Sequence, residues 1–182
     1  KDNDYYKKSI KFYSIALKKI NEEHFLVPKI LYRRGTSYER LGEWENAEND
    51  FLKSLEINSE QAEVLNYLAY SWIDKGINIE EGLEMLKKAI NLREDGYIID
   101  SLGWAYYAKE NYDEAKIFLQ KAVELLPNDP IITDHYADSL WMTKNIIQAR
   151  YLWNAVLKME NVEEELRKKI NHKLIFGITK KI

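Results

Sequence analysis

One cluster in the sequence combines residue types that could do acid–base or metal chemistry. His135 lies between Asp134 and Asp138 in the segment TDHYAD, whereas His24 and His172 are isolated. Imidazole and carboxylate groups together can transfer protons or bind a metal ion. On a helix, Asp134 and Asp138 share a face, but His135 points about 100° away from Asp134. The spacing therefore favours a structural role for His135 over catalysis or metal binding.

No other segment of the sequence carries a familiar catalytic motif. The sequence has no G-x-S-x-G, no Gly-rich phosphate loop and no H-E-x-x-H. The chain has no cysteine, which excludes disulfides, thiolate ligands and a cysteine nucleophile. Glu80, Glu81 and Glu84 lie near an expected helix start, where acids are stabilised by the helix dipole. We therefore expect no enzymatic activity, no metal and no cofactor.

Composition and charge narrow the class further. The 182 residues are 46% hydrophobic and 31% charged, which excludes wholesale disorder, and the net charge of −3 is too small to specify a partner. No stretch approaches the roughly 18 apolar residues of a membrane span. The segment RKKINHK (167–173) could contact phosphates, but no groove-reading element accompanies it. We expect neither a nucleic-acid partner nor a membrane span in this sequence.

The elements that must position all these residues form an internal repeat. Small residues return at a spacing of 34 residues, at Gly35, Ala69, Gly103 and Ala137. A bulky residue follows each of them three positions later, and a second set of small residues occupies Ala47, Gly82, Ala115 and Ala149. Such a pattern is typical of paired antiparallel helices, in which small residues allow close approach and neighbouring pairs bury the apolar faces. It predicts an all-α right-handed superhelix.

This pattern resembles the tetratricopeptide repeat, whose signature is a bulky–small pair, an aromatic residue, Ala-x-x-x-Phe and a proline over about 34 residues. Four repeats match, at 28–61, 62–95, 96–129 and 130–161. The sequence departs from the family pattern at several places, including Ser59 for proline, Gly82 for alanine and Val156 for alanine. Arg34 stands where leucine is usual, the turn GINIEE has one extra residue, and Lys144 replaces a turn glycine.

The two ends of the sequence differ. Residues 4–20 predict a helix, and Ser9, Tyr13 and Ala16 have the spacing of the second helix of a repeat. We therefore expect residues 1–27 to be the second helix of a truncated repeat plus a connector, with a natural N-terminal cap as the alternative. Residues 162–182 predict a C-terminal capping helix and tail, with Gly177 as the stop, which makes about ten helices in all.

The resemblance also implies where a partner would bind. In this family the first helices of the repeats line a concave groove, at the fifth, ninth and twelfth positions of each repeat. The corresponding residues here are Tyr32, Thr36 and Glu39; Asn66, Tyr70 and Ile73; Asp100, Trp104 and Tyr107; and Asp134, Asp138 and Trp141. Trp104 and Trp141 lie outside the core positions, unlike Trp72 and Trp153, so they suggest a partner surface. The alternative is that both rings pack on neighbouring helices or on a capping element.

The signs of the charges predict the partner's chemistry. One subgroup of these repeats holds the carboxylate end of chaperone tails with basic residues and asparagine. This sequence has Asn66, but it places Asp100, Asp134 and Asp138 where the subgroup needs cations. We therefore expect an apolar protein segment or peptide that carries at least one basic residue.

A narrower resemblance covers about residues 62–160. The motifs DSLGWAYY and DHYADSLW are similar to those of C-terminal arrays in bacterial, especially alphaproteobacterial, tetratricopeptide proteins. Some relatives are envelope lipoproteins, and one is an adaptor that brings cell-wall hydrolases to a protease. The resemblance implies a non-catalytic scaffold in the periplasm or at the outer membrane, with the cytoplasm as an alternative. Two other functions stay open, namely self-association through the first or last helix, and targeting of a larger enzyme.

Overall fold

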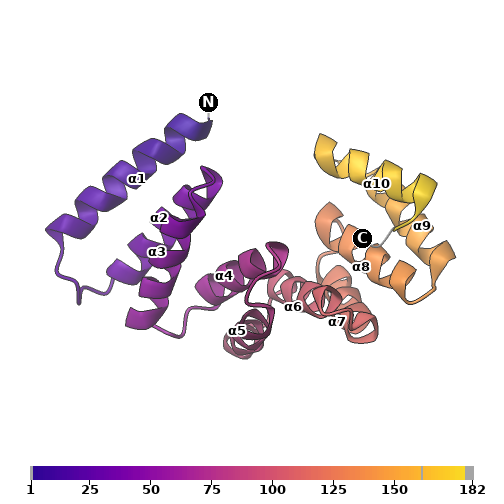
Figure 1. Ribbon diagram of the computed structural model, residues 1–182, viewed down its shortest axis with the longest axis horizontal. Helices are drawn as coiled ribbons and strands as arrows, with labels where there is room; N and C mark the ends of the chain where they lie inside the picture. The colour runs from indigo at the N-terminus through magenta and orange to yellow at the C-terminus, as the bar shows by residue number, and fades with distance from the viewer. Residues whose placement is uncertain (1, 161, 179–182) are drawn as a thin grey trace. The chain divides into compact units, whose positions relative to one another are not determined.

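The fold of the described residues is entirely helical. The computed structural model describes residues 2–160 and 162–178, where it has ten helices and no strand. These helices are α1 (Asp2–Lys19), α2 (Val27–Arg40), α3 (Trp44–Ile57), α4 (Ala62–Asp74), α5 (Ile79–Leu92), α6 (Gly96–Ala108), α7 (Tyr112–Leu125), α8 (Pro130–Met142), α9 (Ile146–Val156) and α10 (Glu164–Phe176) (Figure 1). The predicted all-α helical-repeat class is confirmed. Residue 1 of the predicted first segment, residue 161 of the predicted fourth repeat and residues 179–182 of the predicted tail lie outside the described residues.

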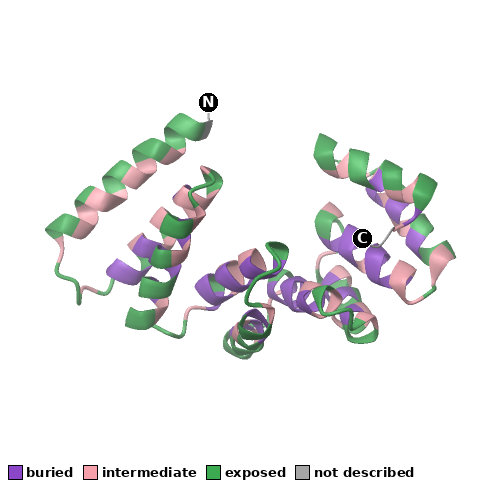
Figure 2. Ribbon diagram, viewed as in Figure 1, coloured by how far each residue is buried: buried purple, intermediate pink, exposed green. Residues whose placement is uncertain are grey.

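The chain divides into two compact units, Lys1–Leu68 and Ala69–Ile182, with the boundary inside α4. In unit 1, α2 packs against both α1 and α3. The buried side chains of unit 1 include Val27 and Leu31 of α2 and Phe51 of α3, whereas α1 contributes only partly exposed side chains to its contact with α2 (Figure 2). Unit 1 therefore has its core around α2 and α3.

In unit 2, consecutive helices pack as antiparallel pairs that stack on their neighbours. The pairs α6–α7 and α8–α9 are in contact, and α7 packs on α8. Trp72 and Trp153, the two tryptophans at predicted core positions, are 2% and 0% exposed. The last helix, α10, contributes Ile170 to a core that also contains Trp153 and Val156. It occupies the residues for which the sequence predicts a capping helix.

The small residues act as the spacing predicts. A Cβ built on Gly103 would lie 2.6 Å from Cγ of Leu119, so α6 and α7 approach more closely than any side chain at this position would allow. Replacement by a larger residue would overpack the contact and destabilise the fold by roughly 1–3 kcal/mol.

The turns within the repeats accommodate the departures from the family pattern. Gly42 has φ +78° in the first turn, and Lys144 takes the same left-handed region, with φ 67°, where glycine is usual. The extra residue of the second repeat extends the turn between α4 and α5, where Asn78 adopts φ 46°. Left-handed backbone is unfavourable for most residues but tolerated by asparagine, so these substitutions strain the turns without removing them.

Two of the helices begin at aspartates that cap them. The Asp95 side chain accepts a hydrogen bond from the amide of Tyr97, and Asp129 accepts from Ile131 and Ile132. Pro130 follows at the first position of α8, where the missing N–H is not needed. These caps fix the starts of α6 and α8, the helices that carry half of the predicted groove positions. None of the helices within residues 2–160 and 162–178 is long and apolar enough to cross a membrane.

Candidate functional site

Aromatic side chains at the predicted groove positions of unit 2 form a stack. The Trp104 ring lies nearly parallel to the Tyr107 ring, with centroids 4.6 Å apart, and to the His135 ring of α8, with centroids 4.0 Å apart. Trp104 and Tyr107 stay partly exposed, whereas His135 is buried. The stack therefore presents a fixed aromatic edge at the surface of α6.

A buried ion pair holds this stack from beneath. Nδ1 of His135 lies 3.0 and 3.1 Å from the two carboxylate oxygens of Asp100. Burial alone would lower the pKa of His135, but the charge of Asp100 and its hydrogen bond outweigh burial and raise the pKa above its ordinary value. His135 is thus a structural link between α6 and α8. The sequence predicted that it would not pair with Asp134, and its hydrogen-bonding partner is Asp100.

The other two aspartates share one lysine from the capping helix. Nζ of Lys173 lies between 2.7 and 2.9 Å from all four carboxylate oxygens of Asp134 and Asp138. The indole N–H of Trp153 also donates a hydrogen bond to Asp138, at 3.0 Å. Burial, together with the neighbouring charge of Asp134, raises the pKa of Asp138 to about 7 even though Lys173 opposes the shift. One ammonium group therefore serves two carboxylates.

Trp141, the second predicted groove tryptophan, packs on the end of the capping helix. Its ring lies 5.3 Å from that of Trp153, centroid to centroid. A Cβ on Gly177 would lie 2.2 Å from the Trp141 ring, and Gly177 has φ 73°, so only glycine fits there. The indole remains partly exposed. Most of the Trp141 ring therefore packs within the chain, as the predicted alternative of packing on a capping element describes.

The remaining predicted positions of unit 2 divide between surface and core. Tyr70 is partly exposed, and burial of its hydroxyl together with the nearby carboxylates of Asp74 and Asp100 raises its pKa to about 12. Ile73 is only 4% exposed, and its side chain contacts the position of Gly82 in α5. The expectation that Ile73 faces a partner is therefore corrected, because the close approach of α4 and α5 buries it.

In unit 1 the predicted positions form a separate, smaller cluster. The Tyr67 hydroxyl donates a hydrogen bond of 3.0 Å to Glu39, and its ring meets Tyr32 edge to face at 6.1 Å. The Thr36 hydroxyl donates to the carbonyl of Arg33 in its own helix. The Asn66 Oδ1 atom is buried and has no hydrogen-bond partner among the described residues. An unpaired buried amide oxygen is unfavourable.

The structure thus changes the interpretation of the three aspartates at the predicted groove positions. Asp100, Asp134 and Asp138 are 5–6% exposed and each has a partner within unit 2, so they do not offer free charge to a ligand. The expectation that their charges would select a basic partner is not supported by this arrangement, because each is buried and paired with a group of the chain itself. Their role in the structure is to hold the aromatic residues in place.

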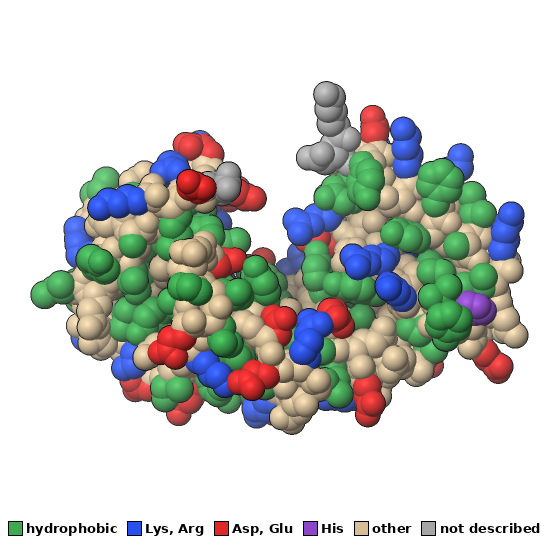
Figure 3. Space-filling model, turned by 180° about the vertical axis from the view of Figure 1, so that it is seen from behind, with side chains coloured by type: hydrophobic (Ala, Val, Ile, Leu, Met, Phe, Trp, Pro, Cys, Tyr) green, Lys and Arg blue, Asp and Glu red, His purple; other side chains and the backbone are tan. Residues whose placement is uncertain are grey.

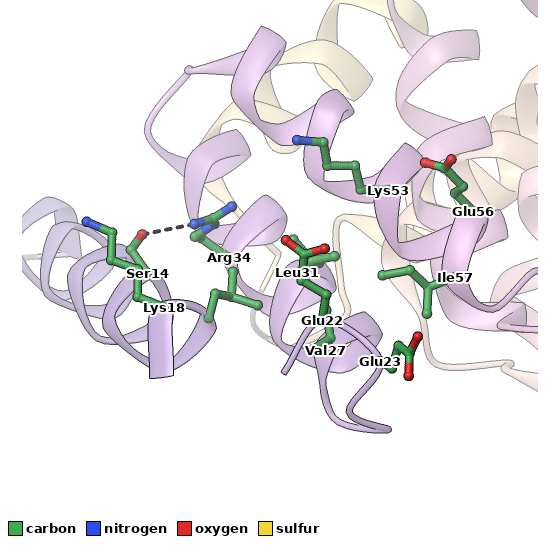
Figure 4. Close-up of a pocket in the computed structure, with 11 residues that line it drawn as sticks. Ser14, Lys18, Glu22, Glu23, Val27, Leu31, Arg34, Lys53, Glu56 and Ile57 are labelled. Atoms are coloured by element: carbon green, nitrogen blue, oxygen red, sulfur yellow. Dashed lines mark hydrogen bonds between the residues drawn. The ribbon is translucent and has the colours of Figure 1, made fainter. Parts of the chain in front are cut away.

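A pocket of unit 1 was not foreseen from the sequence. It has a volume of about 810 Å³ and lies between α1 and α3, with α2 beneath (Figure 4). Leu17, Val27, Leu31 and Ile57 give it an apolar lining. The signal that could have predicted it is the length of the connector between α1 and α2. This connector has seven residues, 20–26, whereas the connectors between α3 and α4, α5 and α6, and α7 and α8 have three or four.

Within the described part of the chain, no group of three or more His, Cys, Asp or Glu side chains could hold a metal ion. On the face drawn in Figure 3, acidic and basic side chains are interspersed with apolar ones. The fold and these surfaces together define a helical-repeat protein whose main features are aromatic surfaces and an apolar pocket.

Comparison with known families names the repeat. Residues 28–61 and 97–129 match models of the tetratricopeptide repeat, and these segments correspond to the first and third predicted repeats. The chain therefore carries tetratricopeptide repeats. Proteins built from such repeats are in general non-catalytic scaffolds for protein interaction.

One similar protein comes from a bacterium. A TPR repeat-containing protein of Pseudomonas aeruginosa is 27% identical over 103 residues, which are 56% of this chain and 18% of that protein. This chain therefore spans only a small part of its relative's length.

Solved structures share the fold. A thermophilic TPR protein of Thermus thermophilus superposes with a TM-score of 0.74 at 18% identity, over 93% of this chain and 91% of that one. A tetratricopeptide repeat protein of Parabacteroides merdae gives 0.75 at 23% identity, over 94% and 66%. YrrB, a TPR protein with an unusual peptide-binding site, gives 0.65 at 21% identity, over 90% and 82%.

Proposed function

We propose that this chain is a non-catalytic scaffold that binds a protein partner. The observation that carries the proposal is the partly exposed stack of Trp104 and Tyr107, fixed from beneath by the buried Asp100–His135 pair. Rigid aromatic side chains lose little entropy on binding and dominate the energetics of many interfaces. The buried ion pair orders the aromatic side chains, so the surface that they form is preorganised for binding. We therefore interpret these residues as a binding surface and not as a reaction centre.

The proposed partner surface is described for each unit by itself. In unit 2 it consists of Tyr70, Trp104, Tyr107 and Trp141. In unit 1 it consists of Tyr32, Thr36 and Asn66, whose side chains are partly exposed. The aspartates of the sequence prediction belong to the support of this surface, and the partner segment is predominantly apolar.

The finer role remains part of the proposal. The similarity to a bacterial TPR protein and the motifs of residues 62–160 support a bacterial scaffold. We place it in an envelope assembly or in protease delivery, at the periplasmic side or the outer membrane, with a cytoplasmic scaffold or a targeting module of a larger enzyme as alternatives. Cell fractionation with an antibody against this chain distinguishes the compartments.

The test uses affinity capture from the native organism, followed by mass spectrometry. The variant Trp104→Ala removes the stack, and Tyr97→Ala, a change of an exposed aromatic residue on the same helix, is the matched control. We expect at least one specific partner to be captured by the wild type and Tyr97→Ala, and lost from Trp104→Ala. If Trp104→Ala stays folded by circular dichroism and captures the same proteins, the proposed surface is wrong.

A second candidate function, self-association, is favoured by one feature of unit 1. Tyr5 and Phe12 on α1 are 68% and 66% exposed, so neither ring is buried against α2. Exposed apolar side chains gathered on one helix are typical of association surfaces. If α1 mediates self-association, Phe12→Lys converts a dimer to a monomer by light scattering, whereas Ile117→Lys, an equally exposed change on α7, leaves the mass unchanged.

A further inference from the structure

We infer that the pocket between α1, α2 and α3 is a second partner-binding site, which accepts a protein segment with a large apolar side chain flanked by basic residues. The site goes beyond the proposed function, because it uses none of the residues of the surface assigned there. It lies entirely within unit 1.

The pocket has the size and the lining of a site that binds an apolar side chain of a partner. Its volume of about 810 Å³ lies in the range typical of ligand sites. The apolar side chains of α1, α2 and α3 line it, and Ile57 remains 48% exposed at its edge. In Figure 4, Lys18 of α1 and Ile57 of α3 come from opposite walls, with Leu31 of α2 between them. A leucine or phenylalanine of a partner would be removed from water there.

At the polar end of the pocket, the Arg34 side chain is engaged in hydrogen bonds within the chain. The Arg34 guanidinium donates two hydrogen bonds of 2.7 Å to Asp50 and one of 3.0 Å to Ser14. Because Asp50 neutralises it, Arg34 does not act as a free cation toward a ligand. Arg34 is the residue that replaces the usual leucine, and its bond to Ser14 ties α1 to α2 beside the pocket.

The charges at the pocket favour a basic partner. Glu22, Glu23 and Glu56 line it, and none of their carboxylates forms an ion pair or hydrogen bond with another described residue. Two lysines, Lys18 and Lys53, also line it, so the carboxylates are in excess. The C-terminal ends of α1 and α3 lie close by and carry partial negative charge. The N-terminus of α2, which begins at Val27 in the lining, carries one opposing partial positive charge. The electrostatic complement is a positively charged segment.

The site lies apart from the predicted groove positions. Leu31 and Arg34 lie on one side of α2, and Tyr32 and Thr36 lie roughly 150° away around the helix, at about 100° per residue. A partner in the pocket and a partner on the groove positions of α2 would therefore contact different faces of this helix.

The experiment measures binding of two labelled peptides to the full chain by fluorescence anisotropy at low salt. The peptides have the same length and the same leucine and phenylalanine residues, and differ only in lysine or glutamate flanks. We expect the lysine peptide to bind with a Kd about tenfold lower than that of the glutamate peptide. Ile57→Arg, which places a long cationic side chain at the pocket edge, is expected to abolish binding of the lysine peptide.

Charge variants and matched controls make the result specific. The triple change Glu22→Lys, Glu23→Lys and Glu56→Lys is expected to reverse the preference between the peptides. Leu52→Arg and Glu60→Lys alter exposed residues of unit 1 outside the pocket and are expected to change nothing.

Three results would overturn the inference. They are lysine-peptide binding that survives Ile57→Arg, no saturable binding of that peptide at all, and dimerisation of the chain that Ile57→Arg abolishes, which would make a second copy the occupant. The first of these results, combined with loss of binding in Trp104→Ala, would refute the pocket while supporting the proposed function. Loss in Ile57→Arg with retention in Trp104→Ala supports the pocket whether or not the surface of Trp104 binds a partner.

Discussion

Each unit of the chain buries charged side chains, but the two balance them differently. In unit 1, Arg34 faces Asp50 in a bidentate pair, one cation with one anion. In unit 2, Lys173 is shared between Asp134 and Asp138, so that the acids exceed the cation.

The difference in balance gives the two units different responses to pH. The hydrogen bond and charge of Asp50 raise the pKa of Arg34 further above its already high value, so Arg34 stays charged near neutrality. In unit 2, burial and then the neighbouring charge of Asp134 raise the pKa of Asp138 to about 7. Buried pairs of either kind contribute little net stability compared with apolar residues, but the loss of one partner is severe.

The largest expected effect breaks the shared lysine of unit 2. Lys173→Met leaves Asp134 and Asp138 buried without their cation, and we expect the docking of α10 to be destabilised by about 3–5 kcal/mol. Hydrogen exchange of α10 peptides, read by mass spectrometry, measures the change. Adding Asp138→Asn to Lys173→Met should recover part of the protection, and an α10 that stays protected in the single variant would contradict the role given to Lys173.

A somewhat smaller effect is expected in unit 1, where one carboxylate rather than two is left unpaired. Arg34→Leu restores the usual residue of the repeat but orphans Asp50, which is 1% exposed, and we expect a loss of about 3 kcal/mol. Urea denaturation measures the loss. The double variant Arg34→Leu with Asp50→Leu is expected to unfold within about 1 kcal/mol of the wild type, because no charge is then buried. An equally unstable double variant would show that the pair itself stabilises the unit.

The smallest effect sharpens the comparison through pH. The pKa of Asp138 is raised by folding, so the folded chain holds a proton that the unfolded chain releases, and stability falls as pH rises through about 7. The raised pKa of His135 acts in the same direction. From about pH 6 to about pH 8 we expect unit 2 to lose about 1 kcal/mol.

Site-resolved hydrogen exchange, corrected for its intrinsic pH dependence, tests this expectation. The peptides of unit 1 serve as the internal control, and Asp138→Asn is expected to flatten the response of unit 2. A loss of equal size in both units would refute the assignment.

The fold could be predicted because its information is local and repeated. The return of Gly35, Ala69, Gly103 and Ala137 at one spacing predicts both the helices and their close crossings, and the structure has both. The extra residue in the turn before Glu80 and the end of the last helix at Gly177 could be predicted for the same reason, because each is a local feature of a single turn.

The site was only partly predictable because its contacts join residues far apart in sequence. The positions of Trp104 and Tyr107 follow from the repeat register. The sequence does not show that Asp100 would find His135, or that Lys173 would reach Asp134 and Asp138 from the capping helix, 39 and 35 residues away. Acids at a groove position look alike in sequence whether their partner is a ligand or another part of the chain.

The long connector of residues 20–26 allows two kinds of evolutionary change to proceed separately. Lengthening a flexible surface loop costs little free energy and leaves the crossings of the repeats untouched. Insertions or substitutions in this connector can therefore change the specificity of the proposed pocket during evolution, while the packing of the helices stays the same.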